Sequence, residues 1–322
     1  MRGEVAALDL GTNNCRLLIA RKTFEGFQVV DAFSRVVRLG EGLSTTGRLS
    51  DQAMERTLAA LHVCATKLAR RRVAQVRSVA TEACRRAENG AAFVARVFAE
   101  TGLALDVISP AEEARLAVLG CQTLIDTAAR QTIVFDIGGG STEVVLIERC
   151  DQLPAAEGGF AMAGWVSIPW GVVSLAETET ADSGAPGLRM EAFGRMKGRV
   201  ATHLNGLSAR LGNDVRLLGA SGTVTTLASL HMGLPRYDRR QVDGSWMDTD
   251  DLRALSRSLA ERSPTERAEI PGIGPDRADL VVAGCAILEA LLDATAAGRL
   301  RVADRGIREG ILRSLLARQA CA

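Results

Sequence analysis

The sequence predicts an α/β protein made of two domains of similar design. One observation is length, because 322 residues exceed a single compact core of ordinary size. The other is an internal repeat, in which an apolar strand, an acid, a turn of small residues and a second apolar strand follow one another. It occurs in VAALDLGTNNCRLLIA (5–20) and in TIVFDIGGGSTEVVLIERC (132–150), with Asp9 matching Asp136 at an offset of 127 residues. We therefore expect one domain over 1–128 and a second over 129–322, with the alternative that the last helix packs back on the first domain.

The first repeat unit leads into a third extended segment and a long helix. Residues 28–38 are the expected third strand, and a turn-rich stretch, GEGLSTTGRLS, follows it. Ser50 has the side chain of a helix N-cap, so a helix is expected to begin near Asp51. The apolar face of this helix is formed by Ala53, Leu58, Leu61 and Leu68.

The rest of the first domain alternates strands and helices. Strands are expected at 76–80 and 105–109, with a helix at 91–100 between them. A further helix opens at Pro110 and carries two acids in its first turn. Proline and acids suit this position because the first N–H groups of a helix have no partner within it.

The second domain repeats the alternation of strands and helices. A strand at 216–218 leads through GASGTVTTLASL into a helix, and PGIGPD (271–276) reads as a loop. The longest apolar segment, 280–292, contains Glu289 and predicts a buried helix. Two α/β domains that face each other place ligands in the crevice between them, at the carboxyl ends of their strands.

Composition and charge exclude several classes of protein. Apolar residues make up 47% and charged residues 24%, which is typical of a globular chain and not of a disordered one. The net charge of +1 excludes a globally basic protein, so we expect no nucleic-acid partner. The densest basic run, Arg70 to Arg72, is expected to be a solvated helix end. Any anionic ligand must be held by a local cluster of donors.

Cysteine and histidine usage predicts a reduced compartment without zinc. The seven cysteines form no CxxC pair and the three histidines are scattered, so neither a zinc site nor a disulfide framework is expected. The first apolar run contains Asp9, which is not typical of a secretory signal. No uncharged apolar window of about 18 residues is present. We therefore expect a cytoplasmic protein with no membrane partner.

Three glycine-containing turns have the composition of phosphate-binding loops. Glycine lets several backbone N–H groups approach one phosphate and permits positive φ. A helix follows the third turn at once and adds its N-terminal dipole. The alternative is three tight turns without a ligand. The residues concerned are Gly11, Thr12, Asn13 and Asn14 in the first turn, Gly138, Gly139, Gly140, Ser141 and Thr142 in the second, and Gly219, Ser221, Gly222 and Thr223 in the third.

Two other phosphate motifs are excluded. The chain contains no GxxxxGK[ST], so it is not a P-loop enzyme. It also fails the dinucleotide fingerprint, because Glu143 takes the place of the third glycine and the turn runs into a strand.

The acids beside these turns predict a magnesium site. A carboxylate next to a bound phosphate is repulsive unless a hard cation bridges the two, and Mg²⁺ prefers few protein oxygens together with waters and phosphate oxygens. Asp9, Asp136 and Glu143 are the candidate ligands. The alternative is that these acids accept N–H bonds and stabilise the turns.

Seven phrases, in order, carry a family resemblance: DLGTNNCRLLIA, ATEACRRAEN, VISPAEEARLAVLG, FDIGGGSTEVVLI, LLGASGTVTTL, DRADLVVAGCAIL and VADRGIREGIL. From residue 8 to residue 312 the chain resembles the exopolyphosphatase/guanosine pentaphosphate phosphohydrolase (Ppx/GppA) family. The resemblance implies two ribonuclease-H-like domains of the actin, sugar-kinase and heat-shock ATPase superfamily, with the active site in the cleft between them.

The resemblance also implies roles for individual residues. Glu113 matches the family's general base; the residues alone do not decide between Glu112 and Glu113. Asp136 and Glu143 match the metal-associated acids, and Arg85 matches an arginine that contacts substrate phosphate. The glycine turns match the phosphate loops, and we count Arg16 with the first of them.

The expected activity is magnesium-dependent release of terminal orthophosphate from inorganic polyphosphate. Such hydrolysis needs an in-line water, a base that orients it and cations on the transferring phosphoryl group. One alternative is removal of the 5′-terminal phosphate of guanosine pentaphosphate, and another is a sugar or acetate kinase of the same fold. A third is a non-catalytic protein that binds polyphosphate or alarmones, which the joint presence of Glu113, Glu143 and Asp136 disfavours.

Two departures from the family pattern bear on substrate choice. Asn14 stands where many relatives have serine, which removes a hydroxyl from the first turn. The chain also stops soon after VADRGIREGIL, whereas longer relatives continue into a helical domain that helps bind long polyphosphate. We therefore expect a preference for short polyphosphate or a nucleotide; a homodimer is left open.

Overall fold

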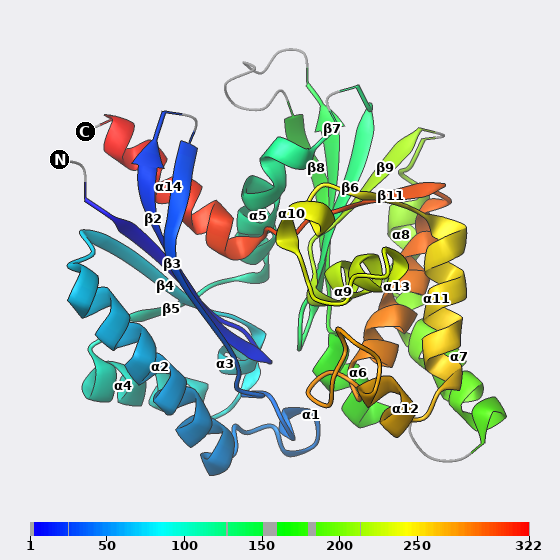
Figure 1. Cartoon of the computed structure of the whole chain (residues 1–322), viewed down its shortest axis with the longest axis horizontal. Coiled ribbons are helices and arrows are strands. Elements are labelled where there is room, and N and C mark those ends of the chain that lie inside the picture. Colours follow the sequence, from blue (N-terminus) through cyan, green and yellow to red (C-terminus); the bar gives the residue numbers. More distant parts are fainter. Residues whose placement is uncertain are drawn as a thin grey trace. The chain divides into compact units, whose positions relative to one another are not determined.

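The computed structural model describes residues 3–24, 26–126, 128–150, 160–179, 185–212 and 214–321, and it divides into two compact units (Figure 1). Residues 1–120 and 306–322 form the first unit, and residues 121–305 form the second. The division thus falls before the boundary expected at 128/129. The last helix belongs to the first unit and not to the second.

The first unit contains a five-stranded sheet in the order β3-β2-β1-β4-β5. Strands β1 (Val5–Leu10), β2 (Asn14–Thr23) and β3 (Gly26–Val36) are antiparallel neighbours. Strands β4 (Gln75–Ala80) and β5 (Leu105–Val107) continue the sheet parallel to β1. The carboxyl ends of β1, β4 and β5 therefore meet at one edge.

Helices cover both faces of this sheet. One core gathers side chains of the strands with those of α2 (Asp51–Arg71) and α4 (Gly90–Thr101). Another joins the opposite face to α5 (Pro110–Cys121) and α14 (Ile307–Cys321), and Figure 1 draws α14 in red beside the blue strands. The short helices α1 (Leu43–Thr46) and α3 (Glu82–Arg86) follow β3 and β4. The chain thus returns from residue 306 to finish the first unit.

The second unit contains a six-stranded sheet in the order β10-β11-β9-β6-β7-β8. Its strands are β6 (Gln131–Ile137), β7 (Thr142–Arg149), β8 (Phe160–Ile168), β9 (Val215–Gly219), β10 (Trp246–Asp248) and β11 (Arg299–Val302). Strands β8-β7-β6-β9-β11 repeat the order and directions of β3-β2-β1-β4-β5, and β10 is added antiparallel at the edge. The two-copy prediction is confirmed, and each copy is a ribonuclease-H-like α/β unit.

One large core holds the second unit together. Helix α13 (Val281–Thr295) is buried along almost its whole length, as expected of the apolar segment around Glu289, which is 1% exposed. Helices α7 (Pro186–Ala201), α9 (Gly222–His231) and α11 (Thr249–Glu261) contribute to the same core. Shorter elements are η1 (Gln122–Leu124), α6 (Val172–Thr178), α8 (Asn205–Ser208), α10 (Arg239–Val242) and α12 (Pro264–Ala268).

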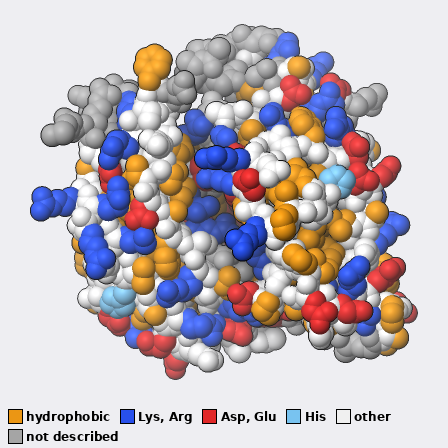
Figure 2. Space-filling view, viewed as in Figure 1, with side chains coloured by type: hydrophobic (Ala, Val, Ile, Leu, Met, Phe, Trp, Pro, Cys, Tyr) orange, Lys and Arg blue, Asp and Glu red, His pale blue; other side chains and the backbone are white. Residues whose placement is uncertain are grey.

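Local signals in the sequence correspond to observed contacts. The Ser50 hydroxyl accepts a hydrogen bond from the Ala53 N–H at 3.2 Å, which confirms the N-cap of α2. Lys, Arg, Asp and Glu side chains are interspersed on the visible surface (Figure 2), in keeping with a net charge of +1. Within the described residues, no helix is both long and apolar enough to cross a membrane.

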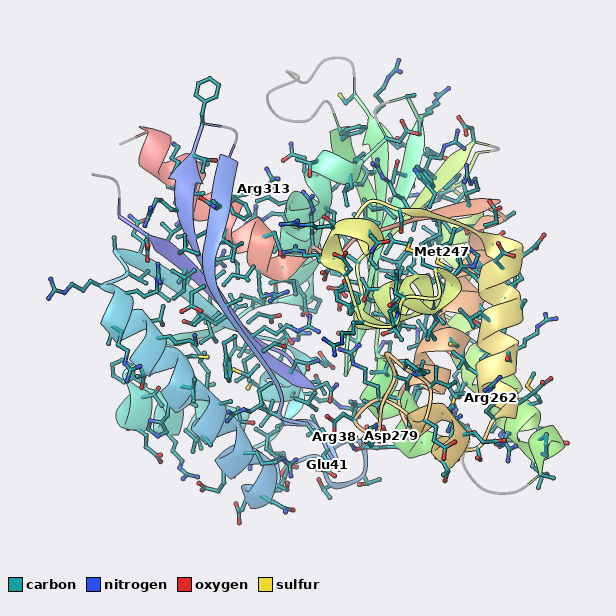
Figure 3. All side chains as sticks on the ribbon, viewed as in Figure 1. Arg38, Glu41, Met247, Arg262, Asp279 and Arg313 are labelled. Atoms are coloured by element: carbon teal, nitrogen blue, oxygen red, sulfur yellow. The ribbon has the colours of Figure 1, made fainter. Side chains whose placement is uncertain are left out.

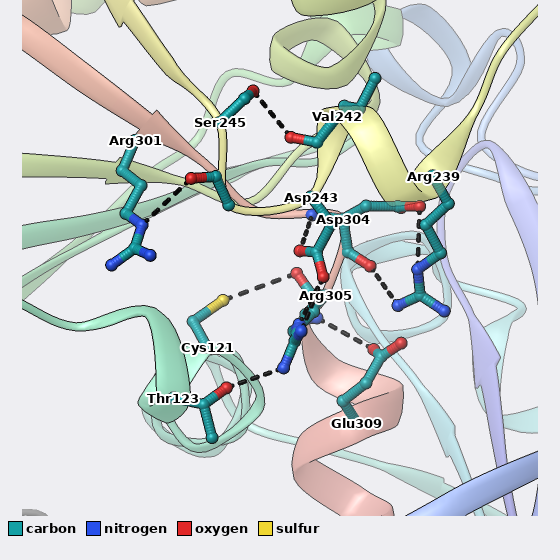
Figure 4. Close-up of polar contacts among 12 residues, drawn as sticks. Cys121, Thr123, Arg239, Val242, Asp243, Ser245, Arg301, Asp304, Arg305 and Glu309 are labelled. Atoms are coloured by element: carbon teal, nitrogen blue, oxygen red, sulfur yellow. Dashed lines mark hydrogen bonds and ion pairs between the residues drawn. The ribbon is translucent and has the colours of Figure 1, made fainter.

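Polar contacts of Arg305 join the two ends of the second unit (Figure 4). Its guanidinium donates to Asp243 Oδ2 at 2.8 and 2.7 Å and to Thr123 Oγ1 at 2.7 Å. The Cys121 thiol donates to the Arg305 carbonyl at 3.5 Å. The start and the end of this unit are therefore fixed to each other.

In the first unit, the N-terminal end of α14 packs against α5. A Cβ built on Gly120 would lie 2.0 Å from the carbonyl oxygen of Gly306, and one built on Gly310 would lie 2.0 Å from that of Leu116. Such distances are far below ordinary contact, so only glycine allows the two backbones to approach this closely.

Candidate functional site

The two repeated hairpins end in the same four-residue turn. Gly11 N–H donates to the Asn14 carbonyl at 2.9 Å, and Gly138 N–H donates to the Ser141 carbonyl at 3.0 Å. The offset of 127 residues seen in the sequence therefore holds for the hydrogen bond that closes each turn. Both turns lie where the first strand of their sheet ends.

The first turn is braced by the loop after β3. The carbonyl of Asn13 accepts the N–H groups of Val37 and Arg38 at 2.9 and 3.0 Å, and that of Thr12 accepts the N–H of Gly40 at 3.0 Å. Arg38 has a φ of 46°, an unusual value for a residue with a side chain. Figure 3 labels Arg38 and Glu41 in this loop. With their carbonyls engaged, Thr12 and Asn13 show no acceptor for their N–H groups among the residues described.

The second turn is braced by the start of α6. Val172 N–H donates to the Gly138 carbonyl at 2.9 Å and Val173 N–H to the Gly139 carbonyl at 2.8 Å. A Cβ on Gly171 would lie 2.4 Å from the carbonyl carbon of Gly139, so this approach also requires glycine. In the described part of the chain no acceptor takes the N–H groups of residues 139–141. Adjacent backbone donors of this kind form an anion-binding nest.

The third turn feeds directly into α9. Ser221 Oγ accepts the N–H of Val224 at 3.1 Å and caps the helix. The N–H groups of Gly222 and Thr223 have no acceptor within the described ranges, and the helix dipole adds to their attraction for an anion. Because Phe135 pairs with Gly219 across β6 and β9, this turn follows the strand next to the one that carries the second turn. The second unit thus gathers two donor sets at one sheet edge.

Two acids face each other across the second hairpin. Asp136 pairs with Glu143 in the register of β6 and β7. Glu143 is 2% exposed, and its Oε1 accepts the hydroxyls of Ser141 at 2.8 Å and Ser167 at 3.0 Å. These hydroxyls fix the orientation of a buried carboxylate beside the glycine nest. Oxygen ligands held in this way suit a hard cation.

Asp9 occupies the matching position in the first unit. Its Oδ1 is buried and has no hydrogen-bond partner in the described structure, and the same is true of Asn13 Oδ1. Burial raises the pKa of Asp9, and the charges of Arg16 and Arg308 oppose this shift only in part. Arg16 lies directly opposite Asp9 in the β1–β2 ladder. A buried carboxylate oxygen without a donor fits a cation ligand, and the raised pKa shows that ionisation is costly without one.

Glu113 and Arg85 form an ion pair at the ends of the neighbouring strands. Glu113 lies in the first turn of α5, is 6% exposed, and receives Arg85 Nη1 at 3.2 Å. The same nitrogen donates to the Ile108 carbonyl at 2.6 Å. Burial lowers the pKa of the Arg85 guanidinium, but the negative charges of Glu113 and Glu82 outweigh burial and raise it. Two residues that sequence analysis nominated separately are therefore in contact.

Glu112 and Glu113 have different surroundings. Glu112 receives Arg115 at 2.7 Å and Arg77 at 2.9 Å, and these arginines lower its pKa. It therefore takes part in a peripheral ion-pair cluster. Glu113 is buried and forms an ion pair with Arg85. Residue order could not separate the two acids, because both lie in the first turn of the helix.

Two residues near the site were missed by sequence analysis. Glu82 accepts both Nε and Nη2 of Arg85, at 3.1 and 2.6 Å, three residues earlier on α3. Ser167 reaches Glu143 from β8. Spacing on α3 could have suggested the first pair, since residues three apart share a helix face. No local pattern indicates the second.

The structure brings the nominated residues together within each unit. In the first unit, Asp9 lies near the end of β1, and the first turn, Arg85 and Glu113 follow the adjacent strands β1, β4 and β5. In the second, Asp136 lies near the end of β6 and Glu143 near the start of β7, and the two turns follow β6 and β9. The sharing of one cleft by the two domains stays a prediction. No three His, Cys, Asp or Glu side chains cluster as a complete metal site in the part of the chain that is described.

Comparisons with known proteins agree with this architecture. The model of the Ppx/GppA phosphatase family matches residues 18–319. Exopolyphosphatase 2 of Mycobacterium tuberculosis (strain CDC 1551 / Oshkosh) is 32% identical over 327 residues, which cover 97% of this chain and 98% of that protein. The crystal structure of an Aquifex aeolicus member of the Ppx/GppA family is 30% identical, with a TM-score of 0.80 and 98% of each chain covered. An exopolyphosphatase from Cytophaga hutchinsonii, 24% identical, shares the fold with a TM-score of 0.86 over 98% of each chain. This chain belongs to the Ppx/GppA phosphatase family.

Proposed function

We propose that the protein releases terminal orthophosphate from inorganic polyphosphate. The observation that carries this proposal is the buried carboxylate of Glu113, held by Arg85 at 3.2 Å on the sheet edge that also bears the first glycine-containing turn. A carboxylate beside backbone phosphate donors is the arrangement that directs water at a phosphoanhydride. The relative from Mycobacterium tuberculosis is named an exopolyphosphatase, which supports the substrate class.

Glu113 acts as the base in this proposal. Its oxygens orient the attacking water and accept its proton, a contribution of about 10²–10⁴-fold in rate for a well-placed general base. The backbone N–H groups of residues 12–13, 139–141 and 222–223 bind phosphate oxygens. These donors are fixed before substrate arrives, because each turn is braced through its carbonyls or by a helix cap.

The acids beside the turns fit magnesium. Asp136 and the buried Glu143 would hold it in the second unit, and Asp9, with its unpartnered oxygen, fits a cation in the first. Magnesium held there would neutralise charge on the transferring phosphoryl group. Glu143 itself is fixed by two hydroxyl donors, and a bound cation would give Asp9 a partner for a charge that burial disfavours.

Phosphate release from the purified protein tests the proposal. Short polyphosphate, long polyphosphate, guanosine pentaphosphate and ATP are each incubated with and without magnesium, and orthophosphate is measured. We expect magnesium-dependent release from polyphosphate, faster per chain end for short polymers. Preference for guanosine pentaphosphate would reassign the substrate to the alternative. Binding of either polyanion without hydrolysis would overturn the enzymatic role.

A pair of adjacent variants isolates the proposed base. Glu113→Gln removes the carboxylate, whereas Glu112→Gln removes the neighbouring acid that faces Arg77 and Arg115. The first variant should lose turnover and the second should keep it. Equal effects of the two substitutions would contradict the assignment of Glu113.

A further inference from the structure

The guanidinium of Arg85 is almost fully occupied by protein. Nε and Nη2 donate to Glu82 Oε2 at 3.1 and 2.6 Å, and Nη1 donates to Ile108 O at 2.6 Å and to Glu113 Oε2 at 3.2 Å. Arginine has five N–H donors, and these four contacts leave one. A phosphate that approaches Arg85 can therefore form a two-pronged contact only if it displaces a protein acceptor.

The charges around Arg85 also oppose an incoming phosphate. Two carboxylates, those of Glu82 and Glu113, contact the guanidinium of Arg85, so an incoming phosphate meets negative charge at the cation that would bind it. The side chains of Arg85 and Glu82 are 20% and 17% exposed, which leaves them accessible but incompletely screened by water. Phosphate must compete with Glu82 for a cation that Glu82 already neutralises.

The backbone around Arg85 holds the Glu82–Arg85 pair beside the first glycine-containing turn. Glu82 and Arg85 lie three residues apart on α3, which starts directly after β4, and Arg85 N–H donates to the Thr81 carbonyl at 3.1 Å. Thr81 N–H in turn donates to the Leu10 carbonyl at 3.1 Å, next to the first glycine-containing turn. The pair is thus attached to the strand end that carries the phosphate donors.

On the basis of the proposed function, we propose that Glu82 is a positioning residue that holds Arg85 against Glu113 and competes with substrate phosphate for its guanidinium. Glu82 keeps the base and its cation aligned while the site is empty. Substrate binding then exchanges one carboxylate for a phosphate at the same N–H groups. The contact sets the apparent affinity for polyphosphate and leaves the chemical step to Glu113.

Steady-state kinetics of Glu82→Gln tests this role. Removing the competing charge should lower KM for short polyphosphate by about three- to tenfold, the size expected of a partly exposed charged contact. The value of kcat should stay within about twofold. Glu112→Gln is the matched control, since it removes an acid from the same unit that does not contact Arg85, and its KM should equal that of the wild type. An unchanged or higher KM in Glu82→Gln would overturn the competition.

The pH profile gives a second readout that a purely structural role would not move. Loss of the Glu82 charge removes a negative neighbour of the Arg85–Glu113 pair and so favours ionised Glu113, and the acidic limb of kcat/KM should shift to lower pH. A limb that stays in place would overturn the alignment of Arg85 with Glu113. If Glu82→Gln does not fold, Glu82→Ser removes the same carboxylate, and circular dichroism verifies the fold of each variant.

Binding in a catalytically silenced background separates this inference from the proposed function. In Glu113→Gln, calorimetric titration with short polyphosphate should give a lower Kd when Glu82→Gln is added. An equal or higher Kd would overturn the role of Glu82 even if the wild type hydrolyses polyphosphate. If Glu82→Gln tightens binding but the wild-type protein releases no phosphate, the proposed hydrolase activity is overturned and the competition is retained.

Discussion

Two glycine-to-alanine substitutions in helices should have opposite effects on stability. Gly310 lies at the contact between α5 and α14, whereas Gly198 lies on α7 away from any neighbour. In Gly310→Ala the new Cβ would meet Leu116 at 2.0 Å from its carbonyl oxygen, 2.9 Å from its carbonyl carbon and 3.1 Å from its Cα. All three are backbone atoms, so a rotamer change cannot relieve the clash and the helices must separate. In Gly198→Ala, on the exposed side of α7, the Cβ meets no atom within 4 Å.

The two magnitudes follow from these surroundings. Alanine gains about 1 kcal/mol over glycine in a helix interior. Overpacking costs typically about 1–3 kcal/mol and more where backbone must move, so Gly310→Ala should destabilise the protein by about 2 kcal/mol after the propensity gain. That corresponds to a fall in Tm of about 4–8 °C for a unit of this size. Gly198→Ala should raise stability by about 0.5–1 kcal/mol.

Thermal unfolding followed by circular dichroism measures both changes, and hydrogen exchange of the α5 and α14 amides localises the first. Because Leu116 lies one turn after Glu113, Gly310→Ala should also lower kcat. A Gly310→Ala protein as stable as the wild type, with unchanged exchange in α5, would refute the close packing. Equal destabilisation by Gly198→Ala would show that any helical substitution has this effect.

Three further predictions concern the site. Glu113→Gln should lower kcat by about 10²–10⁴-fold and leave polyphosphate binding intact, as single-turnover kinetics and calorimetry can measure; wild-type turnover would remove Glu113 from the mechanism. Chelation should abolish phosphate release and magnesium should restore it, whereas release in the presence of excess chelator would refute the metal requirement. Because burial raises the pKa of Asp9 above its ordinary value of 3.8, its ionisation costs stability at neutral pH. Asp9→Asn should therefore unfold at a higher Tm than the wild type at pH 7, with a difference that vanishes below about pH 3.8, and an equal or lower Tm at pH 7 would contradict this.

The repeated architecture could be predicted because its signal is local. Asp9 and Asp136 each end an apolar strand, and each precedes a turn that a single hydrogen bond closes. The Ser50 cap and the buried helix around Glu289 are local in the same sense, since each depends on neighbouring residues or on a continuous apolar run.

Contacts between distant segments could not be predicted from one sequence. Arg85 meets Glu113 across 28 positions, and Ser167 meets Glu143 across 24. Neither separation is one at which residues of a single helix or strand would contact each other. The assignment of residues 306–322 to the first unit was an alternative that the sequence left open, because an amphipathic helix carries no mark of the sheet that it covers. The glycines of VADRGIREGIL acquire a reason only when the backbone of α5 is placed beside them.

The return of α14 to the first sheet has a consequence for biosynthesis. During translation Val5, Ala7, Leu18 and Val79 emerge early, but their partners Ile307, Ile311 and Leu312 are made last. At about 5–20 residues per second, the ribosome needs roughly 10–40 s to produce the intervening second unit. Throughout that interval the apolar side chains that α14 later covers remain exposed to chaperones. A messenger truncated before codon 306 would leave them permanently without this cover.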